Sequence, residues 1–396
     1  MVTVKTTTIV IDNGGSCIKA GYAGQSEPRK CIPNALARGK KDKKLYVGEK
    51  IGLAEYILTR PSQRGLVLDW ECQKLIWENG LFTKGFNVLQ DAENLTIVLT
   101  VAVCTPQSVR REALDVLFND YRFNRAALVD SIIASQFSPT ITSQFTQEDW
   151  KNPCGLLVEV GFSAITVMPV FNTQPIPHTT QRICIGGRIL NNLLRERLAY
   201  LQLDLDDNPL LIQHIKETTC EVAKPPGLRS CLENLKSKKP KDIIGYVLPD
   251  FDNSSVGFRV ENEQDVPAGA QAVKIGADRF AIPEAVFSPT TFGIDKLGIV
   301  ETIVRSVGLC DECIRDCVAS KIIVSGGSAM IPNFLDRLVA ELEGPLRLVA
   351  PGIDKVRLLT EPDGRLDLTA WRGASQLATN EDDLGFLGIT NREEWK

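Results

Sequence analysis

A segment near the N-terminus, "IVIDNGGSCIKAGYAG", contains residue types that suit phosphate binding. Two β-branched runs flank Gly14, Gly15 and Ser16, so the segment predicts a hairpin whose turn presents mainly backbone N–H groups. Asp12 could hold a magnesium ion through water, and the Lys19 ammonium could reach a phosphate as a point charge. The same pattern is typical of an ordinary hairpin turn, and the segment alone leaves both interpretations open.

Two later segments suggest the same kind of chemistry. In "CGLLVEVGFSAITVMPVF" a strand, a glycine-containing turn and a second strand follow one another, and residues 156–169 match residues 9–22 in type and spacing. We infer an internal duplication that places two lobes on either side of a cleft. In "KIIVSGGSAMIPNFLDRLVAEL" a strand ends just before Gly326 and Gly327, and Pro332 begins a helix. Such turns can face a ligand, although they are also common without one.

The elements around these segments predict an α/β protein with two domains. Apolar residues have helical spacing in 70–82, an apolar run in 94–106 predicts a buried strand, and 106–121 predicts an amphipathic helix. A chain of 396 residues exceeds what one core normally serves. Its net charge of −4 excludes a general electrostatic field for nucleic acid or membrane. Because no long apolar segment marks a signal peptide or membrane span, we expect a soluble intracellular protein.

Three cysteines, Cys310, Cys313 and Cys317, have a spacing that could hold a metal ion. Because these positions also share one face of a helix, and no fourth ligand is evident nearby, we predict a core-facing helix instead. The two histidines, His178 and His214, are remote in sequence and are predicted to be structural. No nucleophile with a partner histidine can be assigned.

The order of motifs along the chain resembles the actin family. "IDNGGSCIKAGYAG" is similar to the first phosphate loop of that family, "VEVGFSAITVMPV" to the second and "IIVSGGSAMIPNF" to the adenosine loop. "IGGRILNNLL", "HIKETTCEVA" and "DRFAIPEAVFSPTTFGIDKLGIVETI" also stand in family order, and the resemblance extends from about Ile9 to Trp395. "GYVLPDF" at 245–251 and "RFAIPEAVFSP" most resemble the nuclear actin-related protein six subfamily.

The resemblance implies an actin-like fold, in which two lobes with duplicated ribonuclease-H-like sheets enclose a nucleotide cleft. We expect a small lobe of residues 1–150 and 363–396 and a large lobe of residues 151–362. An inserted subdomain is expected at about 33–60 in the small lobe. An inserted helical subdomain is expected at about 186–272 in the large lobe.

The same resemblance implies which residues contact the nucleotide, ATP or ADP, and an accompanying magnesium ion (Mg2+). Asp12 and Glu159 would lie on the metal side and act through water, and Lys355 would lie beside the adenine. The complete set expected at the nucleotide is Asp12, Gly14, Gly15, Ser16, Lys19, Glu159, Gly161, Gly187, Arg188, Lys216, Glu217, Gly326, Gly327, Met330 and Lys355.

Several residues depart from what ATP hydrolysis in this family requires. The family has a glutamine and a histidine near the attacking water, where we expect Ile132 and Thr166 in this chain. Neither side chain can orient and deprotonate water, so we predict little or no hydrolysis and assign no catalytic residue. Phe162 and Ser163 replace a polar, glycine-rich turn, and a weaker hold on the γ-phosphate is expected. An actin-like ATPase that cycles or polymerises is the alternative function.

The subfamily resemblance implies a scaffold subunit of an ATP-dependent SWR-type chromatin-remodelling complex that exchanges a variant histone. Expected partners are the remodeller ATPase and accessory subunits, with nucleosomes or histones contacted indirectly, weak direct DNA contact and no membrane.

The lysine-rich "RGKKDKKLYVG" stands where actin has a filament contact and opposes end-to-end packing, so no filament is expected. The same segment also suits a solvated loop. A nuclear location is expected, with the cytoplasm left open. A sugar kinase of the same superfamily would need a catalytic carboxylate near the second phosphate loop, and the one candidate, Glu159, is already assigned to the metal by the resemblance to actin.

Overall fold

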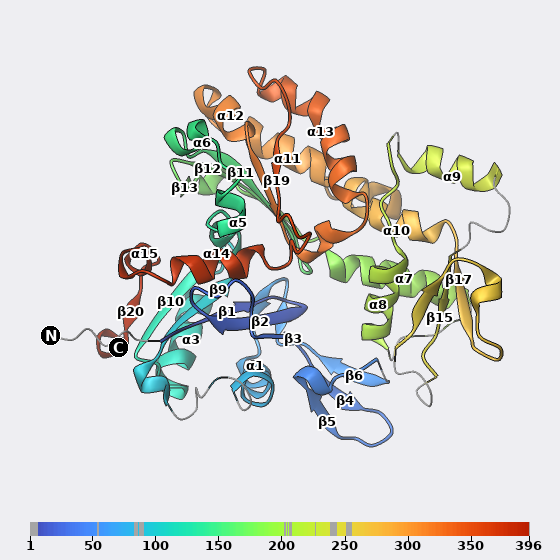
Figure 1. Cartoon of the computed structure of the whole chain (residues 1–396), viewed down its shortest axis with the longest axis horizontal. Coiled ribbons are helices and arrows are strands. Elements are labelled where there is room, and N and C mark those ends of the chain that lie inside the picture. Colours follow the sequence, from blue (N-terminus) through green and yellow to red (C-terminus); the bar gives the residue numbers. More distant parts are fainter. Residues whose placement is uncertain are drawn as a thin grey trace.

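The computed structural model describes residues 7–395 except 54, 83–85, 87–90, 202, 204, 206–207, 226, 238–243 and 251–255. Strands and helices alternate along much of the chain, so the α/β class predicted from the sequence is confirmed (Figure 1). Both predicted hairpins are present as antiparallel strand pairs: β1 (Thr8–Asn13) with β2 (Cys17–Tyr22), and β11 (Gly155–Val160) with β12 (Ile165–Phe171).

The first hairpin belongs to a six-stranded sheet with the strand order β20-β10-β9-β1-β2-β3. Its central strands β1, β9 (Thr96–Val101) and β10 (Arg125–Asp130) run parallel and are mostly buried. The edges are β3 (Lys30–Pro33) and β20 (Thr390–Asn391). The helices of this part are α1 (Trp70–Ile76), α3 (Gln107–Asp115), α14 (Thr369–Leu377) and α15 (Glu381–Phe386). A π-helix over Trp77–Phe82 continues α1, and another over Val116–Asp120 continues α3.

The C-terminal segment returns to this first sheet. β20 pairs antiparallel with β10, and the Trp371 indole of α14 donates to the Val10 carbonyl oxygen at 3.2 Å. Trp371 is fully buried, so α14 is fixed to the face of the sheet. We therefore propose that residues 1–150 and 363–396 form one lobe.

The second hairpin belongs to a sheet with the order β13-β12-β11-β18-β19, in which β14 also pairs with β12. β18 (Ile322–Ser325) runs parallel to both β11 and β19 (Leu358–Leu359). A large apolar cluster fills the space between this sheet and its helices. The remaining elements are β13 (Gln174–Pro175), β14 (Gln181–Ile183), α10 (Asp278–Phe287), α11 (Ile299–Gly308), α12 (Glu312–Ala319) and α13 (Phe334–Val349).

Smaller units are inserted in each half. The antiparallel sheet β5-β4-β6 is formed by β4 (Leu36–Gly39), β5 (Leu45–Val47) and β6 (Tyr56–Thr59), within the expected insertion at 33–60. A two-stranded hairpin, β7 (Ser62–Gln63) and β8 (Leu66–Val67), follows it.

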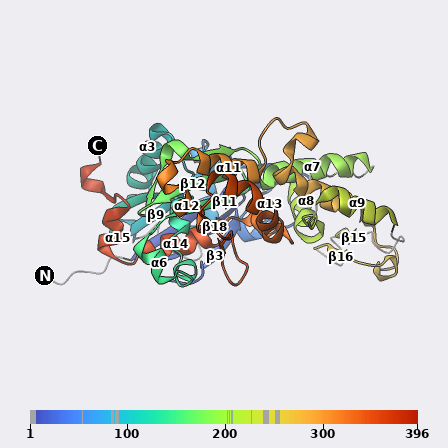
Figure 2. The ribbon, with the colours of Figure 1, turned by 90° about the horizontal axis from the view of Figure 1, so that it is seen from above.

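The insertion at 186–272 is not only helical. It contains α7 (Gly187–Tyr200), α8 (Pro209–Thr219) and α9 (Leu228–Ser237), but also an antiparallel sheet of β15 (Ile244–Val247), β16 (Phe258–Val260) and β17 (Ala272–Ile275). These strands have three or four residues, too few for an alternating pattern to stand out in the sequence. Figure 2 shows α9, β15 and β16 at the end of the molecule opposite α15. Of the "GYVLPDF" motif, Phe251 lies outside the described residues.

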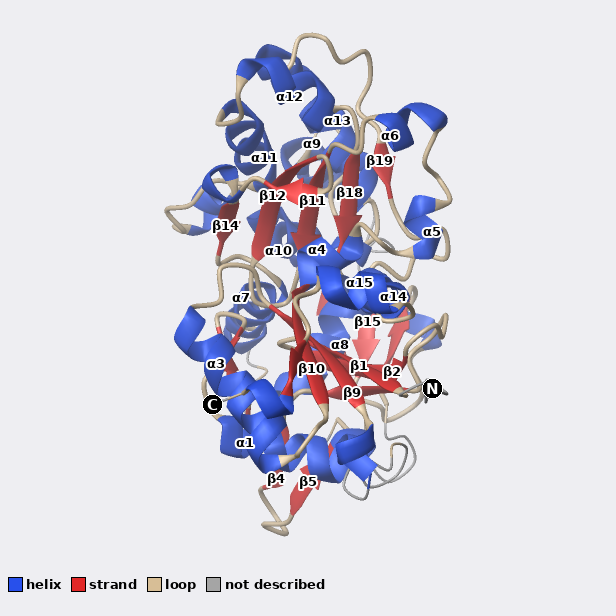
Figure 3. Cartoon of the chain, turned by 90° about the vertical axis from the view of Figure 1, so that its left-hand side faces the viewer, coloured by secondary structure: helices blue, strands red, loops and turns tan. Residues whose placement is uncertain are grey.

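The two main sheets meet through α4 (Ser131–Ser135) and α14, which lie between them (Figure 3). A Cβ atom on Gly373 of α14 would lie 1.8 Å from the carbonyl oxygen of Ala134 in α4. The helices therefore approach as closely as glycine allows. The chain continues from α4 into the second sheet through α5 (Pro139–Thr142) and α6 (Gln147–Lys151).

The predicted core-facing stripe of cysteines is wrong. Helix α12 begins at Glu312, so the buried Cys310 precedes it, while Cys313 is exposed and Cys317 is half-buried. Within the described part of the chain, no group of three or more His, Cys, Asp or Glu side chains is placed to hold a metal ion. No helix among these residues is long and apolar enough to cross a bilayer. His214 lies 2.7 Å from the Tyr246 hydroxyl, a contact that fits the structural role predicted for it.

Candidate nucleotide site

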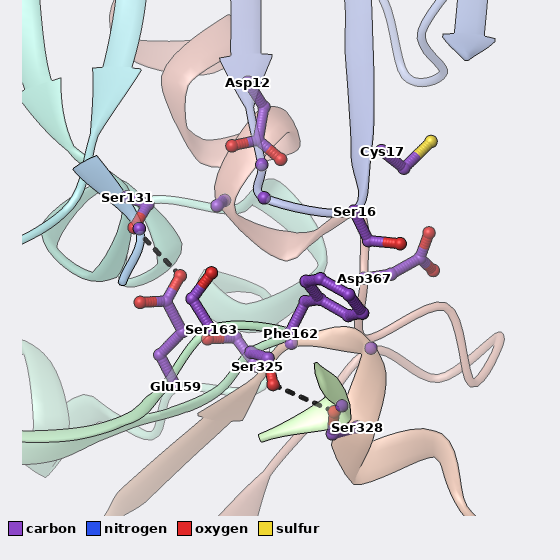
Figure 4. A pocket seen from close by; sticks show the side chains of 18 of the residues that line it. Asp12, Ser16, Cys17, Ser131, Glu159, Phe162, Ser163, Ser325, Ser328 and Asp367 are labelled. Atoms are coloured by element: carbon purple, nitrogen blue, oxygen red, sulfur yellow. Dashed lines mark hydrogen bonds between the residues drawn. The ribbon is translucent and has the colours of Figure 1, made fainter. Parts of the chain in front are cut away.

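A cleft of about 480 Å³ lies between the two hairpins. Its walls come from the turns β1–β2 and β11–β12, the turn after β18, parts of α7 and α8, and the segment before α14 (Figure 4). Most residues expected at a nucleotide line it, namely Asp12, Gly14, Gly15, Ser16, Lys19, Glu159, Gly161, Gly187, Lys216, Glu217, Gly326, Gly327 and Met330. Arg188 and Lys355 do not.

Asp12 and Lys19 face each other across the first hairpin, where β1 and β2 place them opposite one another. The Lys19 ammonium donates to Asp12 Oδ2 at 3.1 Å, and the Thr100 hydroxyl donates to Asp12 Oδ1 at 2.7 Å. Burial alone would lower the pKa of Lys19, but the adjacent Asp12 carboxylate outweighs it and raises the pKa. Lys19 is therefore a fixed positive charge at the floor of the cleft.

Glu159 lies in the second hairpin and points into the cleft (Figure 4). Ser131 donates its hydroxyl hydrogen to Glu159 Oε1 at 2.9 Å. Burial raises the pKa of Glu159 to about 6, the Ser131 hydrogen bond opposes this rise, and the Asp12 charge adds to it. The two carboxylates thus share one cleft, as two groups facing the same cation would.

The expected position of Ile132 is wrong. Its side chain is fully buried in an apolar cluster with Val103, Ile141 and Leu157, and does not line the cleft. The preceding residue, Ser131, lines it instead, because one step along a helix turns the side chain by about 100°. Thr166 does line the cleft, as expected.

The donor set around Asp12 and Glu159 fits a magnesium ion held through water. Both carboxylates, and the hydroxyls of Thr100 and Ser131 beside them, are hard oxygen donors of the kind that Mg²⁺ prefers. Asp12 already accepts two hydrogen bonds. An ion here would therefore keep much of its water shell.

The turn after β18 brings backbone close to the cleft. Gly326 has a φ of +98°, and a Cβ atom there would lie 2.4 Å from the Val160 carbonyl oxygen, so only glycine fits. At Gly327 the nearest neighbour of such a Cβ would be Asp367 Cβ at 3.7 Å. Gly327 therefore borders open space that a ligand could use. Ser325, just before these glycines, is buried, and within the described residues its hydroxyl has no hydrogen-bond partner.

Helix α8 supplies polar groups at the opposite wall. Lys216 donates to the Gly187 carbonyl oxygen at 3.4 Å, and burial lowers the pKa of Lys216. Gln213 donates to Glu217 Oε1 at 2.9 Å and accepts from the Ser16 hydroxyl at 3.3 Å. The second of these bonds crosses the cleft between the hairpin of the first sheet and the insertion of the second.

Two residues expected at the nucleotide, Lys355 and Arg188, do not line the cleft. Lys355 lies in a separate hollow with Asp316 and Gly352, because it precedes β19, whereas the chain returns to the cleft only after that strand. The guanidinium of Arg188 donates to the Ser62 carbonyl oxygen at 3.1 Å, beside the cleft.

Sequence reasoning missed several polar residues that line the cleft, among them Ser131, Ser325, Arg365 and Asp367. Ser325 adjoins the glycine pair, so the motif itself could have identified it. Arg365 donates to both Asp367 carboxylate oxygens, at 2.9 and 3.2 Å. No local pattern marks this pair, because its position depends on how the chain crosses between the sheets.

Comparison with known proteins gives the family. The family model described as Actin matches residues 3–395. Actin-like protein arp6 of Emericella nidulans is 28% identical, covering 98% of this chain and 92% of the relative. Actin-related protein 6 of Arabidopsis thaliana is 28% identical, covering 94% of this chain and 93% of the relative. Actin-related protein 6 of Drosophila melanogaster is 29% identical, covering 97% of this chain and 99% of the relative. With this match over nearly its whole length and two sheets around a common cleft, the chain belongs to the actin family.

Proposed function

We propose that this chain is an actin-related scaffold subunit of an ATP-dependent SWR-type chromatin-remodelling complex that exchanges a variant histone. In this role it binds ATP or ADP, with Mg²⁺, and hydrolyses little or none of it. The chromatin role is supported by the motifs that resemble the nuclear subfamily and by relatives named actin-related protein 6. The nucleotide role is supported by the cleft. The two parts are tested separately.

The observation that carries nucleotide binding is the convergence of three glycine turns on one cleft. Turns at Gly14–Gly15 and at Gly161 offer backbone N–H groups to phosphates, and Lys19 adds a fixed charge. The space beside Gly327 suits the adenosine. Magnesium, held through water by Asp12 and Glu159, would neutralise phosphate charge.

Weak hydrolysis is supported by the polar groups at the phosphate end. Among the described residues that line the cleft there is no histidine, and Ser131 and Thr166 are among those that supply hydroxyls. Ser131 already donates to Glu159, and a hydroxyl is a poor base at neutral pH. Glu159, which would face the metal, is not free to orient a water. Phosphate release from ATP by the isolated protein at actin-like rates would overturn this part in favour of a cycling ATPase.

Nucleotide binding is tested on the purified full chain. We expect a denatured sample to release an adenine nucleotide, and millimolar ATP with magnesium to raise the melting temperature, because a ligand bound only to the native state stabilises it. Gly327→Asp should abolish the shift, since it adds an anion beside Asp367 in the ligand space. Gly327→Ala is the matched control. Neither released nucleotide nor a thermal shift in the native chain would refute the proposal.

The scaffold role is tested by partners and by polymerisation. Lys41, Lys43 and Lys44 are exposed at the turn between β4 and β5, and burying unpaired charges in a filament contact would cost several kcal/mol. Affinity purification from nuclear extract should recover a remodeller ATPase through an interface of roughly 1,000 Å² or more. Pelletable polymer with ATP and magnesium, or capture of cytoskeletal proteins without any remodeller subunit, would contradict the scaffold role.

A further inference from the structure

The segment 60–65 joins the two lobes beside the phosphate end of the cleft. It belongs to the first half of the chain, between β6 and β8, yet its backbone is bound by side chains of the second half. Arg188 of α7 donates to the Ser62 carbonyl oxygen at 3.1 Å, and Arg182 of β14 donates to the Arg64 carbonyl oxygen. These are polar contacts from the large lobe to the small lobe.

Arg60 makes the corresponding contact in the opposite direction. Its guanidinium packs over the ring of Phe162, with 5.0 Å from Cζ to the ring centroid, and Phe162 belongs to the β11–β12 turn. The Arg188 guanidinium lies 5.4 Å from the same centroid. One aromatic ring of the large lobe is thus contacted by arginines from both lobes, a geometry in which cation–π attraction operates.

Arg60 also holds the first phosphate turn. Its Nη1 lies 3.2 Å from each of three backbone carbonyl oxygens, those of Gly15, Ser16 and Asn34. Because a trans peptide is planar, a carbonyl that points to Arg60 directs the following N–H the opposite way. The N–H groups of Ser16 and Cys17 therefore point away from Arg60, and both residues line the cleft. Arg60 fixes the orientation that a phosphate-binding turn requires.

Among the described residues, no carboxylate neutralises the charge of Arg60 or Arg188. Within the part of the chain that the structure describes, neither guanidinium forms an ion pair with a carboxylate. Burial, and then the Arg188 charge, lower the pKa of Arg60 to about 10. A polyphosphate bound nearby would relieve this repulsion. Ligand binding and closure of the lobes should therefore favour each other.

We propose that Arg60 and Phe162 form an interlobe clasp that holds the first phosphate turn in its binding conformation and slows the escape of nucleotide. The proposal rests on the nucleotide binding proposed above. For a nucleotide to leave, the lobes must separate, and separation breaks the Arg60–Phe162 contact as well as the Arg188 hydrogen bond to Ser62. Arg60 is a positioning residue, since it acts on the site through the turn and through closure, whereas Phe162 also lines the cleft itself.

The test is the dissociation rate of a fluorescent ADP analogue from the full chain after a chase with excess ADP. Phe162→Leu and Arg60→Gln should each release the analogue roughly tenfold faster, the ratio expected for a partly desolvated cation–π contact. The double variant should be little faster than Arg60→Gln alone, because Arg60→Gln already removes the contact with Phe162. Arg29 lies 4.4 Å from the ring centroid of Tyr22 outside the cleft, so Arg29→Gln and Tyr22→Leu are matched controls that should leave the rate unchanged.

A second measurement separates the clasp from nucleotide binding. Hydrogen exchange on the nucleotide-free chain should show faster exchange at the amides of residues 15–17 in Arg60→Gln and Phe162→Leu, with the other sheet amides unchanged. Unchanged release rates together with unchanged exchange would overturn the clasp. If the chain binds no nucleotide, the proposed function fails, while the exchange result still supports or overturns the effect of Arg60 on the turn. Far-ultraviolet circular dichroism identifies any variant that fails to fold, and Arg60→Lys then replaces Arg60→Gln.

Discussion

Arg372 offers a direct test of what holds the lobes together beneath the cleft. Its side chain, on α14, is only 7% exposed, and Nη1 lies 2.6 Å from Oε2 of the fully buried Glu361. It also pairs with Asp363 at 2.6 Å and with Glu27. Both of these carboxylates are about half exposed, so water screens their attraction to Arg372. These two ion pairs therefore add little to the free energy of unfolding. The pair with Glu361 therefore dominates the energetics.

Replacing Arg372 with Met keeps the apolar stem and removes the guanidinium. Glu361 then stays buried, and its remaining donors among the described residues are the hydroxyls of Ser138 and Thr140. Removing one partner of a buried pair leaves an uncompensated charge, so we expect a loss of about 3–5 kcal/mol in the free energy of unfolding. The double change Arg372→Met with Glu361→Gln removes that charge and keeps an acceptor for Ser138. It should recover more than half of the loss.

Urea unfolding at pH 7.5 measures both variants, with tryptophan fluorescence and circular dichroism as signals. Trp371, the neighbour of Arg372 in α14, is fully buried and therefore reports on this junction. A single variant that unfolds within about 1 kcal/mol of the native chain would show that the Arg372–Glu361 pair does not dominate. A double variant no more stable than the single one would show that the unpaired Glu361 charge is not the cause of the loss.

Three further predictions concern single residues. Glu159→Gln should stabilise the nucleotide-free chain by about 2 kcal/mol at pH 7.5 but not at pH 4.5. Burial raises the pKa of Glu159 to about 6, so the ionised carboxylate lowers the free energy of unfolding as pH rises from about 4.5 through 6. Equal gains at both pH values would contradict this prediction. For Asp149, burial raises the pKa, but hydrogen bonds from a backbone N–H and from Arg357 outweigh burial and lower the pKa to about 2. The ionised carboxylate therefore contributes about 2 kcal/mol to the free energy of unfolding above pH 4, and this contribution is lost toward pH 2. In urea unfolding, Asp149→Asn should be less stable than the native chain at pH 7 and should match it near pH 2. Gly326→Ala should lower the free energy of unfolding by about 2 kcal/mol or more, because Gly326 has a φ of +98° and a Cβ there would lie 2.4 Å from a carbonyl oxygen. Gly327→Ala should lower it by less than about 1 kcal/mol. Similar melting temperatures for the two variants would contradict this prediction.

Residues within a local motif were predictable from the sequence. Glycine turns at the end of β-branched runs indicated both hairpins and the turn after β18, because the turn chemistry and the strand pattern are both contained in a few adjacent residues. The duplication of the hairpin pattern indicated a cleft between two sheets. Asp12, Glu159 and Gly327 were assigned to one wall or another of that cleft on this basis, together with the family resemblance.

Residues placed by distant parts of the chain were not predictable in the same way. Lys355 and Asp367 stand on either side of β19, and only the path of the chain decides which of them reaches the cleft. The choice between Ile132 and Ser131 depends on a helix rotation of one residue, which a single sequence does not fix. Arg60 has no motif around it, because its partners are carbonyl oxygens and a ring about a hundred residues away.

Strand β20 determines when the first sheet can be completed during synthesis. Residues 155–359 contain every strand of the second sheet in one continuous stretch, so that sheet can form as soon as they have left the ribosome. The first sheet must wait until Thr390 and Asn391 emerge to cover β10. Until then the nascent chain carries a finished sheet next to one with an open edge of unpaired N–H and C=O groups. That edge is where a chaperone would bind and where unfinished chains would aggregate.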